Sequence, residues 1–180
     1  MEIAILKQEL KEACKYAFVD IVEEHKYEGI NSFALSYDQR TMKLFPSVNT
    51  MHYLNQALAL HGDHFWHFKY DPTYWKYVGT GACEAFESIY NKLRSYAATV
   101  QALHQSNEKL HNWKRTLYDT CTAALEDLVQ SRFFLNVAQR NILVLYTAAD
   151  CIGVKCHYLH MMKRLNTDTI LKEYEQELQK

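Results

Sequence analysis

The sequence predicts an α+β fold, a small, mainly antiparallel sheet packed against several helices. Glycine and proline number only 5 and 2 among 180 residues, so turns are few and helices dominate. Segments 33–37 and 42–48 have the character of two strands separated by a short turn, as in a hairpin. No internal repeat or low-complexity linker divides the chain, so we expect a single domain over residues 1–180.

The first third of the chain begins with a helix and continues into this hairpin. Apolar residues recur at mostly helical spacing through 3–25, and Gly29 follows as a helix-ending residue. Segment 33–37 alternates apolar and small residues, which predicts a strand with one strongly apolar face. A turn at 38–41 leads to the second strand, 42–48.

The middle of the chain contains a short helix, an ambiguous segment and a long helix. Thr50 or Asn49 caps the short helix at 51–60. Segment 64–70 alternates aromatic and polar residues, and we interpret it as a strand. Asp71 followed by Pro72 then begins a single helical turn.

The second half is mostly helical. Apolar residues at helical spacing predict helices over 83–104 and 112–130, with a polar interruption between them. The continuous apolar segment 141–149 predicts a central strand covered on both faces. The chain is helical again from about residue 155, and Asp168 caps a C-terminal helix at about 169–179.

Composition excludes several classes of protein. A formal net charge of −1 argues against a general nucleic-acid binder, which needs a basic surface to displace counterions. No apolar segment approaches the roughly 18 residues of a membrane helix, and the N-terminus lacks a secretory signal, so we expect a cytoplasmic protein. The odd number of cysteines, 5, is then typical of reduced thiols, most of them buried.

Familiar catalytic motifs are absent from the sequence. It contains no GxSxG nucleophile motif and neither of the common glycine-rich phosphate-binding loops, GxxxxGK[ST] and GxGxxG. Its carboxylates are scattered over predicted helix faces. We therefore expect no enzyme activity and no cofactor.

The densest group of metal-ligand residue types is His61, Asp63, His64 and His67. Neither a helix nor a strand presents all three imidazoles on one face, because i and i+6 diverge on a helix and i+3 reverses on a strand. A polar loop with solvated histidines is therefore the competing interpretation. The metal hypothesis predicts stoichiometric zinc or iron.

A second group of ligand types follows the apolar segment 141–149. It comprises Cys151, Cys156, His157 and His160, but it lacks the paired CxxC spacing of zinc knuckles, which favours buried thiols over a structural metal. Asp150 ends the apolar segment, where a carboxylate serves either as a turn cap or as a site residue.

Two sets of residues are candidates for contact with a partner protein. Aromatic residues crowd into segment 66–77, where they either cover the sheet or form a binding surface; the candidates are Trp66, Tyr70, Tyr74 and Trp75. Acidic residues recur along the first helix, where they are either an ordinary solvated face or attract a basic partner; the candidates are Glu9, Glu12, Glu23 and Glu24.

Four segments in order resemble a bacterial domain-of-unknown-function family, number 4303. Residues 33–38 (Phe-Ala-Leu-Ser-Tyr-Asp), with Pro46 in the next strand and the helix after it, resemble the family's opening. Residues 70–77 are similar to its tryptophan-flanked Ser-Pro-Ala-Glu-Trp motif, although Tyr70 replaces a usual tryptophan and Tyr74 a usual acid. Residues 142–150 resemble its apolar strand ending in Asp.

Residues 163–166 (Lys-Arg-Leu-Asn) resemble the closing Leu-Asn of that family, so the resemblance covers about residues 3–166. It implies no catalytic residue, since the family has no established reaction. It implies a context, because such proteins often occur beside polymorphic toxin genes and immunity proteins. We therefore expect a cytoplasmic immunity-type protein that binds and neutralises a cognate toxin, as a monomer or homodimer. The alternatives are the metal-binding protein or metalloenzyme described above and a non-catalytic homodimeric regulatory domain.

Overall fold

The computed structural model describes residues 2–38, 40–62, 65–102, 107–148 and 155–179. The elements in these ranges are, in order, α1 (Ile3–His25), η1 (Lys26–Glu28), β1 (Ile30–Asp38), β2 (Lys43–Thr50), α2 (Met51–His61), α3 (Phe65–Tyr70), η3 (Pro72–Tyr74), β3 (Tyr77–Val78), α4 (Cys83–Ala102), α5 (Asn107–Gln130), α6 (Phe133–Ala138), β4 (Leu143–Ala148), α7 (Lys155–Leu165) and α8 (Asp168–Glu177).

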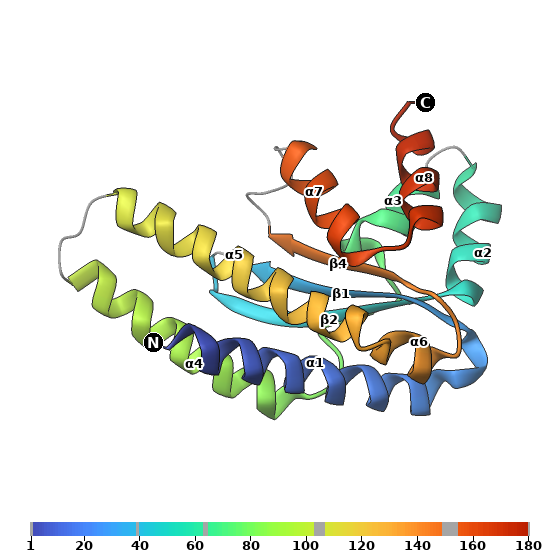
Figure 1. Ribbon diagram of the computed structural model, residues 1–180. Coiled ribbons are helices and arrows are strands. Elements are labelled where there is room, and N and C mark those ends of the chain that lie inside the picture. Colours follow the sequence, from blue (N-terminus) through green and yellow to red (C-terminus); the bar gives the residue numbers. More distant parts are fainter. Residues whose placement is uncertain (1, 39, 63–64, 103–106, 149–154, 180) are drawn as a thin grey trace.

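The strands form one mixed sheet in the order β3-β2-β1-β4. β1 and β2 are the predicted antiparallel hairpin, β3 is antiparallel to β2, and β4 runs parallel to β1. Helices cover both faces: α1, α4, α5 and α6 lie on one side, and α2, α3, α7 and α8 on the other (Figure 1). The predicted helix-rich α+β fold is thereby confirmed.

The face of the sheet toward α1 carries the large apolar side chains. Phe33, Leu35 and Tyr37 alternate along β1 and point to this side. The ring of Phe18 from α1 packs edge-on against Phe33 at 5.5 Å between centroids and against Phe134 at 5.0 Å. This aromatic cluster joins α1, β1 and α6, and it is the centre of the core on that side.

The opposite face of the sheet is lined by small and polar side chains. Ser32, Ala34 and Ser36 of β1 are all buried there, and Ser36 Oγ accepts a hydrogen bond from Thr147 of β4 at 3.1 Å. Ser47 and Asn49 of β2 share this face and are fully buried. Small residues leave room for α3 and α7, whose larger side chains complete the layer.

β4 is the last strand of the sheet, which corrects the prediction of a central position. The apolar segment is buried on both faces, as predicted, but its outer edge meets the side chain of Asn166 rather than another strand. The Asn166 amide accepts the Val144 N–H at 2.8 Å and donates to the Val144 carbonyl at 2.8 Å. Asn166 therefore satisfies one backbone position of an edge that another chain would otherwise pair with.

Three further predictions differ from the structure. Segment 64–70 is predicted as a strand, but residues 65–70 form helix α3. Six aromatic and basic residues are too few to distinguish the helical period from the strand period. Helix α5 begins at Asn107, so part of the predicted polar interruption is helical. Thr167, rather than Asp168, is at the N-cap position of α8, and its side chain makes no capping hydrogen bond. The short elements β3 and α6 were not predicted.

Within the described ranges, none of the helices combines the length and apolar character that crossing a bilayer requires.

Candidate functional site

Segment 51–78, which held most of the candidate residues, folds as α2, α3, η3 and the edge strand β3. Thr50 caps α2 by accepting the Tyr53 N–H at 3.1 Å, and Gly62 ends this helix at a positive φ of 49°. The Asp71 carboxylate accepts the N–H and the hydroxyl of Thr73, which confirms the predicted helical turn at Asp71-Pro72.

The rings of these short elements form a continuous cluster, which we call the aromatic surface. It consists of Tyr53, His61, Trp66, His67, Phe68 and Tyr74. Phe68 lies at its centre, with its centroid 4.5 Å from that of His61 and 5.5 Å from that of Tyr74. Trp66 and Tyr74 are 43% and 47% exposed, respectively. Two of the four predicted aromatic residues therefore present their rings to solvent.

The other two predicted aromatic residues, Tyr70 and Trp75, lie in the core at 3% and 4% exposure. The Tyr70 ring packs edge-on against Tyr174 of α8 at 5.0 Å, and the Tyr70 carbonyl accepts the Tyr158 hydroxyl of α7 at 3.0 Å. Burial raises the pKa of both Tyr70 and Tyr158. These residues anchor the aromatic surface to the helices behind it.

Asn49 fixes the position of the aromatic surface on the sheet. Its side chain is fully buried, donates to the Phe68 carbonyl at 2.8 Å and accepts the backbone N–H of Lys76 at 3.4 Å. A single amide of β2 therefore holds both α3 and the chain that follows η3. The sequence indicates Asn49 only as a candidate cap of the helix that follows it.

The histidines proposed as metal ligands are only partly described. His61 and His67 lie on the aromatic surface, where His61 stacks on Phe68 and His67 contacts Trp66 at 3.8 Å between centroids. Asp63 and His64 lie outside the described residues. Among the residues that are described, no three His, Cys, Asp or Glu side chains are grouped so that they could hold a metal ion.

The second group of ligand types also falls largely outside the description. Cys151 and Asp150 belong to the undescribed segment 149–154, and the Cys156 and His157 side chains, on α7, are not described. His160 is exposed on α7. Cys14 and Cys121 are fully buried, and burial raises the pKa of both thiols.

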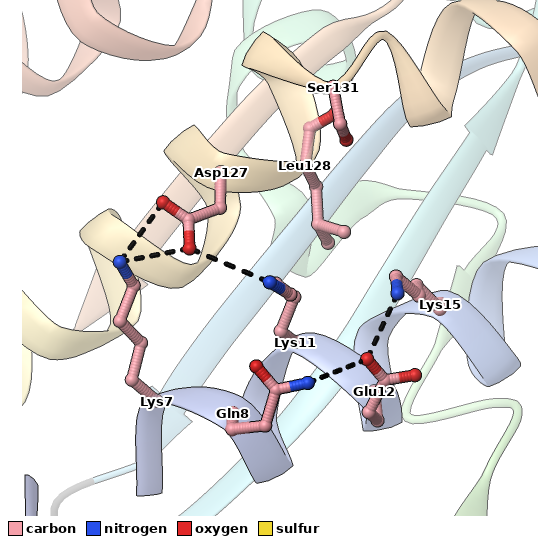
Figure 2. A network of polar contacts seen from close by, with 8 residues as sticks. All are labelled: Lys7, Gln8, Lys11, Glu12, Lys15, Asp127, Leu128 and Ser131. Carbon is pink, nitrogen blue, oxygen red and sulfur yellow. Dashed lines mark hydrogen bonds and ion pairs between the residues drawn. The ribbon is translucent and has the colours of Figure 1, made fainter. Parts of the chain in front are cut away.

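The acidic residues of α1 are not one continuous negative face. Glu9 forms an ion pair with Lys92 of α4, and Glu12 accepts hydrogen bonds from Gln8 and Lys15 at 2.9 Å (Figure 2). Glu23 and Glu24 are exposed near the end of the helix. On the side toward α5, Lys7 and Lys11 both reach the Asp127 carboxylate, at 2.9 and 3.7 Å (Figure 2).

Sequence reasoning missed a polar cluster that joins the end of α1 to β3. The Tyr77 hydroxyl donates to the Glu28 carboxylate at 2.6 Å and lies 3.0 Å from Nδ1 of His25, whose ring stacks on Tyr77. The hydrogen bond from Tyr77 lowers the pKa of Glu28. Desolvation, and then the same hydrogen bond, raises the pKa of Tyr77. Tyr77 lies 49 positions from Glu28 and 52 from His25, so no local pattern indicates the cluster.

Comparison with known proteins gives one match. A family model described as "Domain of unknown function (DUF4303)" matches residues 10–167. No curated protein and no solved structure matches the chain.

Proposed function

The chain belongs to the DUF4303 family of domains of unknown function, and we propose that it is an immunity-type protein. In this proposal it binds a cognate bacterial toxin in the cytoplasm and neutralises it by direct contact through the aromatic surface. The proposal joins the context implied by the family with one observation, the exposed rings of Trp66 and Tyr74.

The aromatic surface has the chemistry of a binding hot spot. Tryptophan and tyrosine are enriched among residues that dominate protein–protein affinity, because each buries a large apolar area while its polar end still finds a partner. Leu60 is 78% exposed and lies seven residues after Tyr53, so it extends the same face of α2. Together these side chains offer an apolar centre for an interface.

The support behind the rings favours tight association. Asn49 holds α3, the Asp71 cap holds η3, and Tyr70 and Trp75 are packed into the core. A rigid surface loses little conformational entropy when it binds, so more of the contact energy remains as affinity. Neutralisation of this kind needs shape and stability rather than a reactive group.

The experiment is a growth rescue. The product of the gene adjacent to this one is induced in a bacterial host, together with this protein, an empty vector or a variant. We expect the neighbour to kill, the wild-type protein to restore growth, and the double variant Trp66→Ala/Tyr74→Ala to protect poorly. The matched control is Tyr16→Ala/Tyr27→Ala, which removes two exposed tyrosines outside the aromatic surface, at 63% and 92% exposure.

The outcomes separate the two parts of the proposal. A harmless neighbour, or one that kills regardless of this protein, contradicts the immunity role. Full protection by the folded double variant leaves immunity standing and rejects the aromatic surface. Circular dichroism and a thermal melt check that each variant is folded. Sedimentation of the wild type and of the double variant tests the homodimer hypothesis, and metal analysis of untagged protein tests the histidine hypothesis.

A further inference from the structure

An open groove of about 710 Å³ runs between α1 and α4. Glu2, Ile5 and Glu9 lie on its α1 wall, and Ser88, Ser95 and Thr99 lie along its α4 wall. This groove is on the opposite side of the sheet from α2 and α3, which carry the aromatic surface (Figure 1). It is therefore independent of the function proposed above.

The charges of α1 are segregated across the helix, and the groove is lined by one more carboxylate than cation among the described residues. Lys7 and Lys11 turn toward α5, where both contact Asp127 (Figure 2). The groove side instead carries Glu2 and Glu9, and Lys92 is the one cation among the described residues that line it. Glu9 pairs with Lys92, which leaves the exposed Glu2 carboxylate without a cation on the groove wall.

The hydroxyl groups of α4 favour a ligand that donates hydrogen bonds. Ser95 donates its proton to the Asn91 carbonyl at 2.8 Å, and Thr99 donates to the Ser95 carbonyl at 3.0 Å. With their protons engaged along the helix, both oxygens remain available as acceptors. Ammonium and guanidinium groups, which only donate, can use these acceptors and also match the charge of Glu2.

The shape and the apolar part of the groove match a helix. The α4 wall from Ser88 to Thr99 is about 17 Å long at 1.5 Å per residue, the length of three turns. Ile5 is 51% exposed, and Leu6 and Tyr96 contribute further apolar lining. Two adjacent helices present a furrow into which the side chains of a third can pack.

We propose that this groove binds a cationic amphipathic helix of a partner protein. Its apolar side chains contact Ile5 and Tyr96, and its lysine or arginine side chains reach Glu2 and the acceptor oxygens of α4. The helix occupies about three turns of the groove.

The test uses a defined probe and the full-length protein. The probe is a fluorescently labelled, amidated peptide of about 14 residues with leucine and lysine at helical spacing, and the comparison peptide carries glutamate in place of lysine. Fluorescence anisotropy measures binding at low and moderate salt. We expect saturable binding of the lysine peptide that weakens with salt, and much weaker binding of the glutamate peptide.

Two kinds of variant locate the binding. Ser95→Trp fills the groove and Glu2→Lys reverses its free charge, and we expect each to weaken binding by at least about fivefold. Glu23→Lys makes the same charge change on the same helix outside the groove, and we expect it to stay within about twofold of wild type. Ser88→Trp is the second blocking variant if Ser95→Trp does not fold.

Four results would overturn the proposal. The first three are the absence of saturable binding by the lysine peptide, equal binding of the glutamate peptide, and unchanged binding by a folded blocking variant. Equal losses for Glu2→Lys and Glu23→Lys also overturn it, since they reveal only a general attraction between charges. None of these results bears on the growth rescue, because the two experiments use different surfaces.

Discussion

Asn166→Asp is the sharpest test of how the exposed edge of β4 is stabilised. The change keeps the size of the side chain but replaces its N–H donor by an oxygen. The Val144 N–H keeps its acceptor, whereas the Val144 carbonyl, at 2.8 Å, loses its donor and faces a carboxylate. The Met162 carbonyl loses its side-chain donor, at 3.3 Å, and keeps only the backbone N–H of residue 166, at 3.1 Å. Two hydrogen bonds are therefore lost and a repulsion is added.

The size of the effect follows from these contacts. Each lost hydrogen bond costs about 0.5–1.5 kcal/mol, and the half-buried position of Asn166 lets water replace part of it. We expect a loss of about 2 kcal/mol in the free energy of unfolding at pH 7. For a chain of this length, that loss lowers the thermal midpoint by about 4–8 °C.

The pH dependence identifies the mechanism. A protonated carboxyl can again donate to the Val144 carbonyl, so the folded state raises the pKa of the new group above its value in the unfolded chain. The destabilisation is then complete at pH values above the raised pKa of the folded state. It shrinks as the pH falls below that pKa toward the unfolded-state pKa of about 4.

The assay is urea unfolding followed by circular dichroism at several pH values, with each variant compared with wild type at the same pH. Asn55→Asp, at an exposed position of α2, makes the same charge change without this edge and is the control. An unchanged stability of Asn166→Asp at pH 7, or a stability difference that does not depend on pH, would refute the reasoning.

Three other predictions concern the core and the polar cluster. Tyr77→Phe removes the largest cause of the lowered Glu28 pKa. The stabilisation linked to Glu28 is present above its unfolded-state pKa of about 4.3 and is lost as the pH falls through the lower pKa of the folded state. The variant should therefore lose less stability in acid than wild type does, which acid unfolding curves can measure. Phe18→Ala should cost about 3–5 kcal/mol in urea unfolding, because it opens a cavity among three aromatic rings; a loss below 1 kcal/mol would contradict this packing. Cys83 is exposed and should react with a thiol reagent in the folded protein, whereas the buried Cys14 should react only on unfolding, as mass spectrometry of the labelled peptides can show.

Tertiary contacts divide the residues that the sequence singles out as candidates for contact with a partner. Trp66, Tyr70, Tyr74 and Trp75 were one aromatic group in the sequence, and the structure divides them into two exposed and two buried rings. Each short element contributes one ring of each kind: Trp66 and Tyr70 lie on α3, and Tyr74 and Trp75 lie at the end of η3. The four candidate glutamates of α1 are likewise divided: Glu9 and Glu12 form ion pairs with lysines, and Glu23 and Glu24 are exposed.

The sequence alone determined the elements whose signals are local. The long helix α1, the hairpin of β1 and β2, the turn at Asp71-Pro72 and the apolar strand β4 follow from periodicity and capping residues, which depend on neighbours within a few positions. The helix-rich α+β fold follows from the same signals. The short segment 65–70, too brief to distinguish the helical period from the strand period, was assigned to the wrong element. The first turns of α5 and the short elements β3 and α6 were missed.

The tertiary structure alone decided which faces and edges are covered. β4 lies at an edge of the sheet, where the side-chain amide of Asn166 takes the place of a neighbouring strand at Val144. Asn166 and Val144 are 22 positions apart in the sequence. The burial of Ser32 and Ser36 depends on helices that pack over the second face of the sheet. The groove between α1 and α4 exists because two helices more than 50 residues apart lie side by side. Such contacts depend on packing between distant segments, and a pattern of adjacent residues does not record them.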